Sequence, residues 1–411
     1  MKAVVFTLGC KVNSCESQAL IRGLYDRGYE VSEELCYADI YILNTCAVTS
    51  EAEKKSRQAI TRIKKFNNNA KIIVTGCASE KNPDSFLSKD GVEIVTGTSS
   101  KEKILELLDE KGKFIFEPET YYHELPLPKT DKVRSFVKIQ DGCNNFCSYC
   151  IIPYLRGRSR SRNPVSIRDE IISLNSLECV LTAINLSAYS YENCNLTGLI
   201  SEIKGVNARI RLGSLEENII SVDFLNALSS LNDFAEHFHL SLQSGCDKTL
   251  KKMNRKYTAE EFRNGVKLIR EYFPNAGITT DVICGYPTET EKDFNESLKF
   301  IESIGFSDIH PFCYSPREGT NSYKLKDLNG SVKQERLNKL INLKNNLKTA
   351  FISKNIGIIQ DVIIEEFIDG YSIGYTGNYI KVYIKDNIKI GKYKVQLIEP
   401  FNDGAIGIVK E

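Results

Sequence analysis

Residues 141–158 read DGCNNFCSYCIIPYLRGR and set Cys143, Cys147 and Cys150 in a C-x3-C-x2-C pattern. Three closely spaced thiolates can hold three irons of a four-iron cluster and leave the fourth iron open to a substrate, whereas electron carriers use four cysteines. A zinc site is the alternative, but structural zinc needs four ligands, and no Cys or His follows within the next dozen residues. The spacing therefore favours an iron–sulfur cluster with an open, catalytic iron.

Three more cysteines each follow a short apolar run that is typical of a buried strand. The runs and their cysteines are Ala3–Phe6 with Cys10, Ile40–Leu43 with Cys46, and Ile72–Val74 with Cys77. Helical stretches near 16–27 and 51–66 separate the runs, which predicts parallel strands. Ligands bind at the carboxyl edge of such a sheet, so we expect these thiols to converge on a second site. The alternative is that they are small buried hydrophobes.

The composition is that of an ordinary soluble globular chain. Its 411 residues suffice for two to four domains, with 42% hydrophobic and 26% charged residues. Met1-Lys2 leads directly into the first apolar run, so we expect no signal peptide, and no stretch approaches the roughly 18 apolar residues of a membrane span. Thirteen cysteines without a secretion signal indicate a reducing cytoplasm. The net charge of +1 does not by itself indicate a nucleic-acid partner.

Seven cysteines belong to neither pattern, and we interpret them as core or incidental residues. They are Cys15, Cys36, Cys179, Cys194, Cys246, Cys284 and Cys313. A free cysteine without neighbouring ligands is usually a small hydrophobic side chain.

Three segments of α/β or β character follow one another. Residues 1–116 predict a doubly wound α/β domain, and 117–131, with three prolines and no periodicity, predict a linker. Between 130 and 345, apolar strands alternate with helices, which predicts a partial (βα)6 barrel. The expected strands are Ser135–Gln140, Cys179–Ile184, Ala208–Leu212, His237–Gln243, Gly277–Ile283 and Asp308–Cys313.

The last segment, 350–411, predicts a small five-stranded antiparallel β-barrel, because short β-type runs alternate with Gly or Asn. The runs are Ile358–Ile368, Tyr371–Tyr375, Tyr379–Ile384, Tyr393–Ile398 and Ala405–Val409. Before this segment, 331–354 predicts one helix rich in Lys and Arg, and we interpret its basic residues as a solvated face.

Arginines stand at alternate positions after the 141–158 cysteines. They are Arg156, Arg158, Arg160 and Arg162. The forked guanidinium donors suit phosphate, so we favour an anion or RNA-backbone role over a solvated loop.

Three polar residues fall at or just beyond the carboxyl ends of predicted barrel strands: Ser214, Glu216 and Gln243. Residues at such positions can hold the ribose or amino-acid part of a nucleotide ligand. The alternative for a lone polar residue is a simple surface position.

Motifs along nearly the whole chain resemble the methylthiotransferase family of radical S-adenosylmethionine (SAM) enzymes. They are TLGCKVN, NTCAV, GCAS, the 141–158 segment, LSLQSG with KKMNRKYT, and YSPREGT. The segments FTLGCKVNSCES and GYTGNYIKVY look most like the branch that acts on N6-threonylcarbamoyladenosine in tRNA. The resemblance implies a methylthiotransferase domain (1–116), a radical SAM core (130–345) and an RNA-binding TRAM barrel (350–411).

The resemblance also implies cofactors and site residues. Two 4Fe-4S clusters would be held, one by Cys10, Cys46 and Cys77, the other by Cys143, Cys147 and Cys150. SAM would bind the open iron of the second cluster and be cleaved to a 5′-deoxyadenosyl radical. The residues expected near SAM are Tyr149, Ser214, Glu216 and Gln243. The expected partners are a tRNA anticodon loop and a reductant such as flavodoxin or ferredoxin, in the cytoplasm and away from membranes.

The implied reaction adds a methylthio group to C2 of threonylcarbamoylated adenine beside the anticodon. The C–H bond there is unactivated, so acid–base catalysis cannot open it and a radical can. The alternatives are methylthiolation of isopentenyladenosine in tRNA or of a ribosomal protein, and a non-enzymatic iron–sulfur protein. Two cysteine triads with open irons count against the last, because carriers bury closed clusters.

Overall fold

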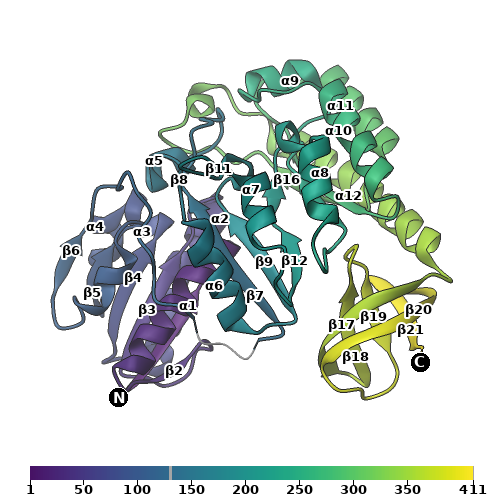
Figure 1. Cartoon of the computed structure of the whole chain (residues 1–411). Helices are drawn as coiled ribbons and strands as arrows, with labels where there is room; N and C mark the ends of the chain where they lie inside the picture. Colours follow the sequence, from purple (N-terminus) through teal and green to yellow (C-terminus); the bar gives the residue numbers. More distant parts are fainter. Residues whose placement is uncertain (129–131, 411) are drawn as a thin grey trace.

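Three β-sheet units follow one another along the chain, and Figure 1 shows them in purple to blue, in teal to green and in yellow. The computed structural model describes residues 1–128 and 132–410, so residues 129–131 of the predicted linker and residue 411 lie outside the described part. Linker residues 117–128 form neither helix nor strand, as predicted. Within the described residues, no helix is both long and apolar enough to cross a bilayer.

The first unit is a parallel sheet in the order β2-β1-β3-β4-β5-β6 with helices on both faces, which confirms the doubly wound prediction. Alternate strand residues face opposite sides, so Val4 and Leu43 pack with Ile60 of α2, whereas Val5 packs with Leu24 of α1. The strands are β1 (Lys2–Thr7), β2 (Glu30–Ser32), β3 (Ile40–Thr45), β4 (Lys71–Gly76), β5 (Val92–Thr96) and β6 (Gly112–Phe114). The helices are α1 (Lys11–Asp26), α2 (Ser50–Phe66), α3 (Cys77–Lys81), α4 (Pro83–Leu87) and the 3₁₀ helix η1 (Lys101–Leu105).

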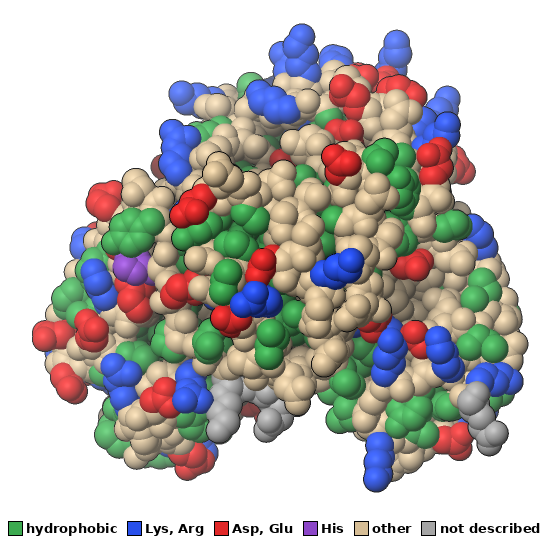
Figure 2. Space-filling view, viewed as in Figure 1, with side chains coloured by type: hydrophobic (Ala, Val, Ile, Leu, Met, Phe, Trp, Pro, Cys, Tyr) green, Lys and Arg blue, Asp and Glu red, His purple; other side chains and the backbone are tan. Residues whose placement is uncertain are grey.

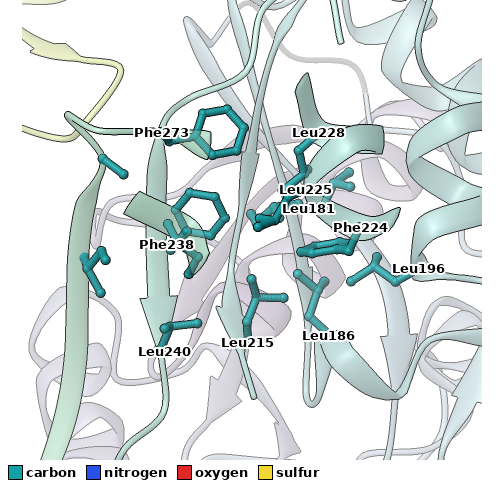
Figure 3. Close-up of a cluster of buried hydrophobic side chains, with 14 of the residues drawn as sticks. Leu181, Leu186, Leu196, Leu215, Phe224, Leu225, Leu228, Phe238, Leu240 and Phe273 are labelled. Atoms are coloured by element: carbon teal, nitrogen blue, oxygen red, sulfur yellow. The ribbon is translucent and has the colours of Figure 1, made fainter. Parts of the chain in front are cut away.

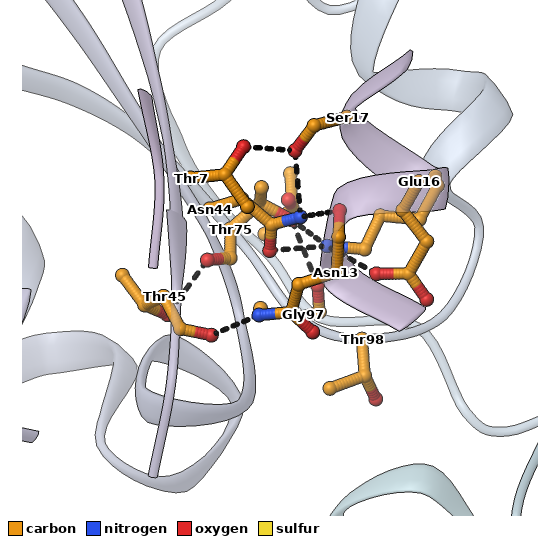
Figure 4. Close-up of polar contacts among 12 residues, drawn as sticks. Thr7, Asn13, Glu16, Ser17, Asn44, Thr45, Thr75, Gly97 and Thr98 are labelled. Atoms are coloured by element: carbon orange, nitrogen blue, oxygen red, sulfur yellow. Dashed lines mark hydrogen bonds and ion pairs between the residues drawn. The ribbon is translucent and has the colours of Figure 1, made fainter. Parts of the chain in front are cut away.

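Polar side chains lock the carboxyl ends of β1, β3 and β4 together (Figure 4). The Thr7 hydroxyl donates to Ser17 Oγ in α1 at 2.7 Å, and Thr45 Oγ1 donates to the Thr75 carbonyl at 2.7 Å. Asn13 Nδ2 donates to the Thr45 carbonyl at 3.0 Å, which ties the start of α1 to β3. These bonds fix the three cysteine-bearing loops of the first unit.

The second unit is an open parallel barrel of βα repeats, as predicted. Parallel ladders run in the orders β7-β9-β12 and β13-β14-β15-β16. The strands β12 and β13 form one chain segment bent at Gly213, which pairs with β9 before the bend and with β14 after it. No ladder of the described residues joins β16 back to β7.

The strands of this barrel are β7 (Arg134–Asp141), β9 (Glu178–Ala183), β12 (Arg209–Leu212), β13 (Ser214–Leu215), β14 (His237–Leu240), β15 (Gly277–Cys284) and β16 (Asp308–Cys313). The outer helices are α6 (Pro164–Leu174), α7 (Leu196–Glu202), α8 (Val222–Ser229), α10 (Ala259–Tyr272), α11 (Glu291–Ile304) and α12 (Gly330–Asn355). Shorter elements are α5 (Ile152–Arg156), α9 (Asp247–Lys252), β8 (Arg160–Ser161), β10 (Ser190–Tyr191) and β11 (Cys194–Asn195).

The main hydrophobic core lies between the barrel strands and their helices (Figure 3). Leu181 of β9, Leu215 of β13 and Phe238 of β14 are fully buried with Phe224 and Leu225 of α8. Each such side chain contributes about 1.5–3 kcal/mol relative to an exposed one. This packing fixes the strands and, with them, the loops at their carboxyl ends.

The third unit is a closed five-stranded barrel with the ring order β17-β18-β19-β21-β20. The prediction of an antiparallel barrel is wrong at one pair, because β19 and β21 run in parallel. The reason is topological: a closed ring with an odd number of strands cannot alternate direction at every step. The strands are β17 (Ile359–Ile368), β18 (Tyr371–Thr376), β19 (Lys381–Ile384), β20 (Gly391–Phe401) and β21 (Gly404–Val409).

The closed barrel docks near the amino-terminal ends of the open barrel's strands. Arg211 Nη1 donates to the Gly377 carbonyl at 3.3 Å, and its guanidinium lies 4.5 Å from the centre of the Tyr379 ring. His237 of β14 stacks on the same ring, with 4.8 Å between ring centres. The closed barrel therefore covers one end of the space inside the open barrel.

A buried group of charges joins the first unit to the second. Glu16 of α1 is fully buried and accepts from Arg156 Nη1 at 2.8 Å and from Lys138 Nζ at 2.9 Å. Asp141, at the end of β7, lies 3.1 Å and 2.7 Å from the same two cations. Burial alone would raise the pKa of Glu16, but Arg156, Lys138 and Lys101 outweigh it and hold that pKa at about 2. We call Glu16, Lys138, Asp141 and Arg156 the charge cluster.

The predicted anion-binding role of the arginines is therefore wrong at two positions. Arg156 is 0% exposed within the charge cluster, and Arg162 is 4% exposed and pairs with Glu124. Arg160 also contacts Asp141, while Arg158 is exposed. Glu16, the partner of Arg156, is 140 positions away in the sequence, so the residues around Arg156 do not predict this ion pair.

Helix α12 also differs from the predicted solvated basic face. Arg336 is 4% exposed and donates to Glu289 at 2.6 Å. Lys344 and Lys348 lie 3.5 Å and 3.6 Å from Asp308 of β16. Lys344 and Lys348 thus contact the last barrel strand, whereas Arg336 contacts the segment before α11.

We expect Arg156→Met to destabilise the chain, because it leaves Glu16 and Asp141 buried with less compensation. Breaking a buried ion pair in this way costs about 3–5 kcal/mol, so the urea midpoint, followed by circular dichroism, should fall by about 1–2 M. Arg158→Met is the matched control, since Arg158 is exposed, and it should shift the midpoint by less than about 0.5 M. Equal midpoints for Arg156→Met and the wild type would contradict a stabilising role of the charge cluster.

Candidate active site

The first set of cysteines lies at the carboxyl ends of three neighbouring strands, as the sequence predicts. Cys10 follows β1, Cys46 follows β3 and Cys77 begins α3 directly after β4. Gly9 has φ +112°, and a Cβ atom there would lie 2.8 Å from Cys46 Cβ and 3.1 Å from its Sγ. Only glycine allows the loop of Cys10 to approach Cys46 this closely.

The thiols of this set influence one another. Cys10 is exposed, whereas Cys46 and Cys77 are buried. The pKa of Cys77 is raised to about 11, mainly by burial and in part by the nearby thiols of Cys10 and Cys46, while Arg156 opposes the rise. The three thiols therefore lie near one another at this edge of the sheet.

The second set lies in a loop after β7 that the backbone holds tightly. Gly142 has φ +71°, and a Cβ atom there would lie 1.9 Å from the Arg158 carbonyl oxygen. The Cys143 amide donates to the Gly157 carbonyl at 3.1 Å, and the Cys150 amide donates to the Cys147 carbonyl at 3.0 Å. The loop therefore curls so that three cysteines at short spacing face one region.

Nitrogen donors point at the sulfur atoms of the second set. Arg255 Nη1 donates to Cys147 Sγ at 3.4 Å, and the Asn145 amide donates to Cys143 Sγ at 3.5 Å. Burial raises the pKa of Cys150 to about 12. Donors to sulfur stabilise thiolate ligands and tune iron–sulfur clusters, so these residues fit such a group. Sequence analysis missed Arg255, which stands in KKMNRKYT 105 or more residues from the cysteines.

The positions of the possible ligands disfavour a structural zinc site, which was the alternative to a cluster. In residues 1–128 and 132–410, no three Cys, His, Asp or Glu side chains come close enough to hold a single metal ion. Structural zinc needs four ligands around one ion. A four-iron cluster has no such need, because each thiolate binds a different iron.

The two sets of cysteines are neighbours in space. Helix α3, which begins at Cys77, packs against α5, which follows Cys150. Arg156, the last residue of α5, donates to Asn13 Oδ1 at 2.8 Å, and Asn13 holds the loops of the first set. The charge cluster therefore fixes the position of one set relative to the other.

A cavity of about 720 Å³ lies inside the open barrel and takes its walls from all three units. Gly9, Cys10 and Lys11 come from the first unit, and Tyr379 is one of the residues that come from the closed barrel. The barrel strands contribute three of the four histidines in the chain, which are His237, His239 and His310. Sequence analysis did not single out Lys11 or these histidines, because only the assembled strands bring them together.

The four residues expected near SAM occupy different surroundings. Ser214 lines the cavity. Glu216 accepts from Asn145 Nδ2 at 2.7 Å and lies 3.0 Å from Arg255, so it supports the loop of the second set. Tyr149 packs near Met253, Tyr286 and Tyr314, and burial raises its pKa well above the usual value. Gln243 has φ +66°, and its amide donates to the Asp281 carbonyl at 2.9 Å.

Two family descriptions match parts of the chain. Residues 2–97 match the uncharacterized protein family UPF0004, and residues 137–301 match the radical SAM superfamily. Among named proteins, the threonylcarbamoyladenosine tRNA methylthiotransferase MtaB of Bacillus subtilis is 37% identical over 386 residues, which cover 89% of this chain and 85% of that protein. The tRNA-2-methylthio-N(6)-dimethylallyladenosine synthase of Clostridium novyi is 35% identical, with 88% and 85% covered.

A solved structure supports the fold. The radical S-adenosylmethionine methyltransferase TsrM of Kitasatospora setae aligns with a TM-score of 0.58 and 14% identity, covering 78% of this chain and 74% of that one. At this identity the likeness concerns the fold alone.

We expect iodoacetamide at pH 8 to alkylate Cys10 at least about 100-fold faster than Cys77 in the iron-free chain, because Cys10 is exposed and Cys77 is buried with a raised pKa. Peptide mass spectrometry over a time course measures both rates. Cys179 belongs to neither set and is fully buried with a pKa of about 12, so it is the control for a slow thiol. Similar rates for Cys10 and Cys77 would show that the strand-end loops are not ordered without iron.

Proposed function

Because this chain belongs to the methylthiotransferase family of radical SAM enzymes, we propose that it adds a methylthio group to C2 of N6-threonylcarbamoyladenosine beside the anticodon of tRNA. The observation that carries this proposal is the pair of cysteine triads, which lie next to each other with Cys10 in the cavity wall. The Bacillus subtilis relative, with its printed name for this substrate, supports the choice of base.

Members of the family use SAM and 4Fe-4S clusters. We propose that the first cluster is held by Cys10, Cys46 and Cys77 and the second by Cys143, Cys147 and Cys150. Bound clusters and SAM together supply the one-electron chemistry that an unactivated C–H bond requires.

The chain's own residues hold and shield these groups. Arg255 and the Asn145 backbone amide donate to sulfur atoms of the second set. Glu216 supports both residues, because it forms an ion pair with Arg255 and accepts a hydrogen bond from the Asn145 side chain. We propose that Ser214, Tyr149 and Gln243 contact SAM from the barrel side. The closed barrel covers the far end of the cavity, which limits the access of water to the reacting groups.

The substrate is a tRNA, and we propose that its anticodon loop enters the cavity. A base there is already largely single-stranded, so exposing it costs at most a few kcal/mol. Tyr375 and Tyr379 line the cavity and stack on each other, with 5.0 Å between ring centres, which gives the wall an aromatic surface. Figure 2 shows acidic and basic side chains mixed over one face of the molecule.

We also propose the domain boundaries 1–116, 130–345 and 350–411, a cytoplasmic location, and flavodoxin or ferredoxin as reductant.

A second candidate is methylthiolation of dimethylallyladenosine in tRNA. The Clostridium novyi relative, 35% identical over 384 residues, carries that substrate in its name. The two candidates share the cysteines and differ in the substituent on N6 of the base.

Anaerobic reconstitution should load about eight irons per chain, since each cysteine triad would hold a four-iron cluster. Replacing Cys143, Cys147 and Cys150 by Ala should leave about four, measured by iron analysis and Mössbauer spectroscopy. A triple Ala variant of Cys36, Cys194 and Cys313, which are half-buried and outside both sets, is the matched control and should keep about eight. An unchanged iron content in the first variant would refute the assignment.

The substrate assay offers the reconstituted protein three anticodon stem-loops, with adenosine, threonylcarbamoyladenosine or isopentenyladenosine beside the anticodon. We expect a methylthio product from the threonylcarbamoylated RNA alone, detected by nucleoside mass spectrometry. The Cys143→Ala variant controls for background. A product from the isopentenylated RNA only would assign the chain to the second candidate.

A further inference from the structure

Among the described residues, one cation in the wall of the central cavity makes no salt bridge. The basic side chains of the wall are Lys11, Arg211, Lys348 and Lys381. Three of them are paired: Arg211 lies 2.9 Å from Glu178, Lys348 lies 3.6 Å from Asp308, and Lys381 lies 3.6 Å from Asp403. Lys11 makes no hydrogen bond or salt bridge with any residue of the described ranges 1–128 and 132–410, although the carboxylates of Glu178 and Asp281 attract it from beyond contact distance.

The ammonium group of Lys11 is available to a ligand that enters the cavity. Lys11 is exposed and lines the cavity, so an anionic ligand could pair with it without displacing a salt-bridge partner. An anionic ligand in the cavity would supply the missing partner.

The helix that carries Lys11 favours the same ligand. Lys11 is the first residue of the 16-residue helix α1, and Gly9 to Val12 all line the cavity. Cys10 caps the helix without a side-chain hydrogen bond to its free amides. The amide groups and the dipole at the start of a helix attract anions.

A second polar group of the cavity is also without a partner. His237 lines the cavity and is 7% exposed, its Nε2 lies 2.9 Å from Thr279 Oγ1, and no hydrogen-bond partner for its Nδ1 exists among the described residues. Buried polar atoms without a partner are rare in native proteins. The described part of the wall therefore holds one lysine without a salt bridge and one histidine nitrogen without a hydrogen-bond partner.

We infer that Lys11 forms a carboxylate-binding site that reads the substituent on N6 of the substrate base. This inference rests on the proposed function, because the threonylcarbamoyl group ends in a free carboxylate and carries a hydroxyl group, whereas an isopentenyl group is an uncharged hydrocarbon. Lys11 follows Cys10 directly, so a carboxylate held by Lys11 places the base beside the first set of cysteines. A charge-assisted hydrogen bond then distinguishes the two substrates. Lys11 is thus a specificity-determining residue.

SAM also carries a carboxylate and is the other source of this chemistry. The proposed SAM site belongs to the second set of cysteines, whereas Lys11 stands in the first unit next to Cys10. We therefore assign the RNA substituent to Lys11, and the experiment measures SAM binding separately.

The test compares two anticodon stem-loops that differ only in charge: threonylcarbamoyladenosine as the free acid and as its methyl ester. Fluorescence anisotropy measures the Kd of each RNA for the chain loaded with both clusters. We expect the wild type to bind the acid at least about 10-fold more tightly than the ester, as one charge-assisted hydrogen bond implies. Lys11→Met should bind the acid as weakly as the ester and leave the ester Kd unchanged within about twofold.

Lys348→Met is the matched control, because Lys348 lines the same cavity but is paired with Asp308, and it should keep the preference for the acid. Iron content and circular dichroism of Lys11→Met must equal those of the wild type, and equilibrium dialysis should give the same SAM affinity. A retained acid preference in Lys11→Met, an equal loss for acid and ester, or a loss confined to SAM would each overturn the inference. A wild type that binds neither RNA would contradict the proposed function itself.

Discussion

The contact between Glu16, Lys138, Asp141 and Arg156 sets the geometry on which the rest of the structure depends. Cys10 stands six residues before Glu16, and Cys150 stands six residues before Arg156, so one buried ion pair spaces the two cysteine sets. Removing water from charges makes their pairing sensitive to position. Lys101 lies 3.7 Å from Glu16 and Arg160 lies 3.3 Å from Asp141, so further cations surround both carboxylates. A shift of α1 against β7 would still separate Glu16 from Lys138 and Arg156, and the cost of losing these buried pairs opposes such a shift.

Burial affects the proton balance of the proposed iron ligands. Under the proposed assignment, Cys77 and Cys150 lose a proton when they bind iron, and burial raises the pKa of both thiols in the iron-free chain. Cluster assembly in this proposal therefore releases protons, and the nitrogen donors at Cys143 and Cys147 would stabilise the charge that remains on sulfur.

Local patterns in the sequence predicted the strands, the helices and the places of both cysteine sets. They succeeded because a strand and the cysteine that follows it, such as Cys46, are both specified by residues within about ten positions of each other. They failed where the partner lies far along the chain: Arg156 reads as a free cation until Glu16 is placed beside it. The parallel pairing of β19 with β21 is required when five strands close into a barrel, and the sequence of one strand does not show that closure. Lys11 shows its role only when three units enclose one space.

The docked barrel at the end of the chain contributes to the central cavity as well as to the surface. Its residues Asn378, Tyr379, Lys381 and Asp403 form part of the cavity wall. Exchanging this barrel for one from another protein would therefore change the cavity lining at the same time, unless these four side chains were kept.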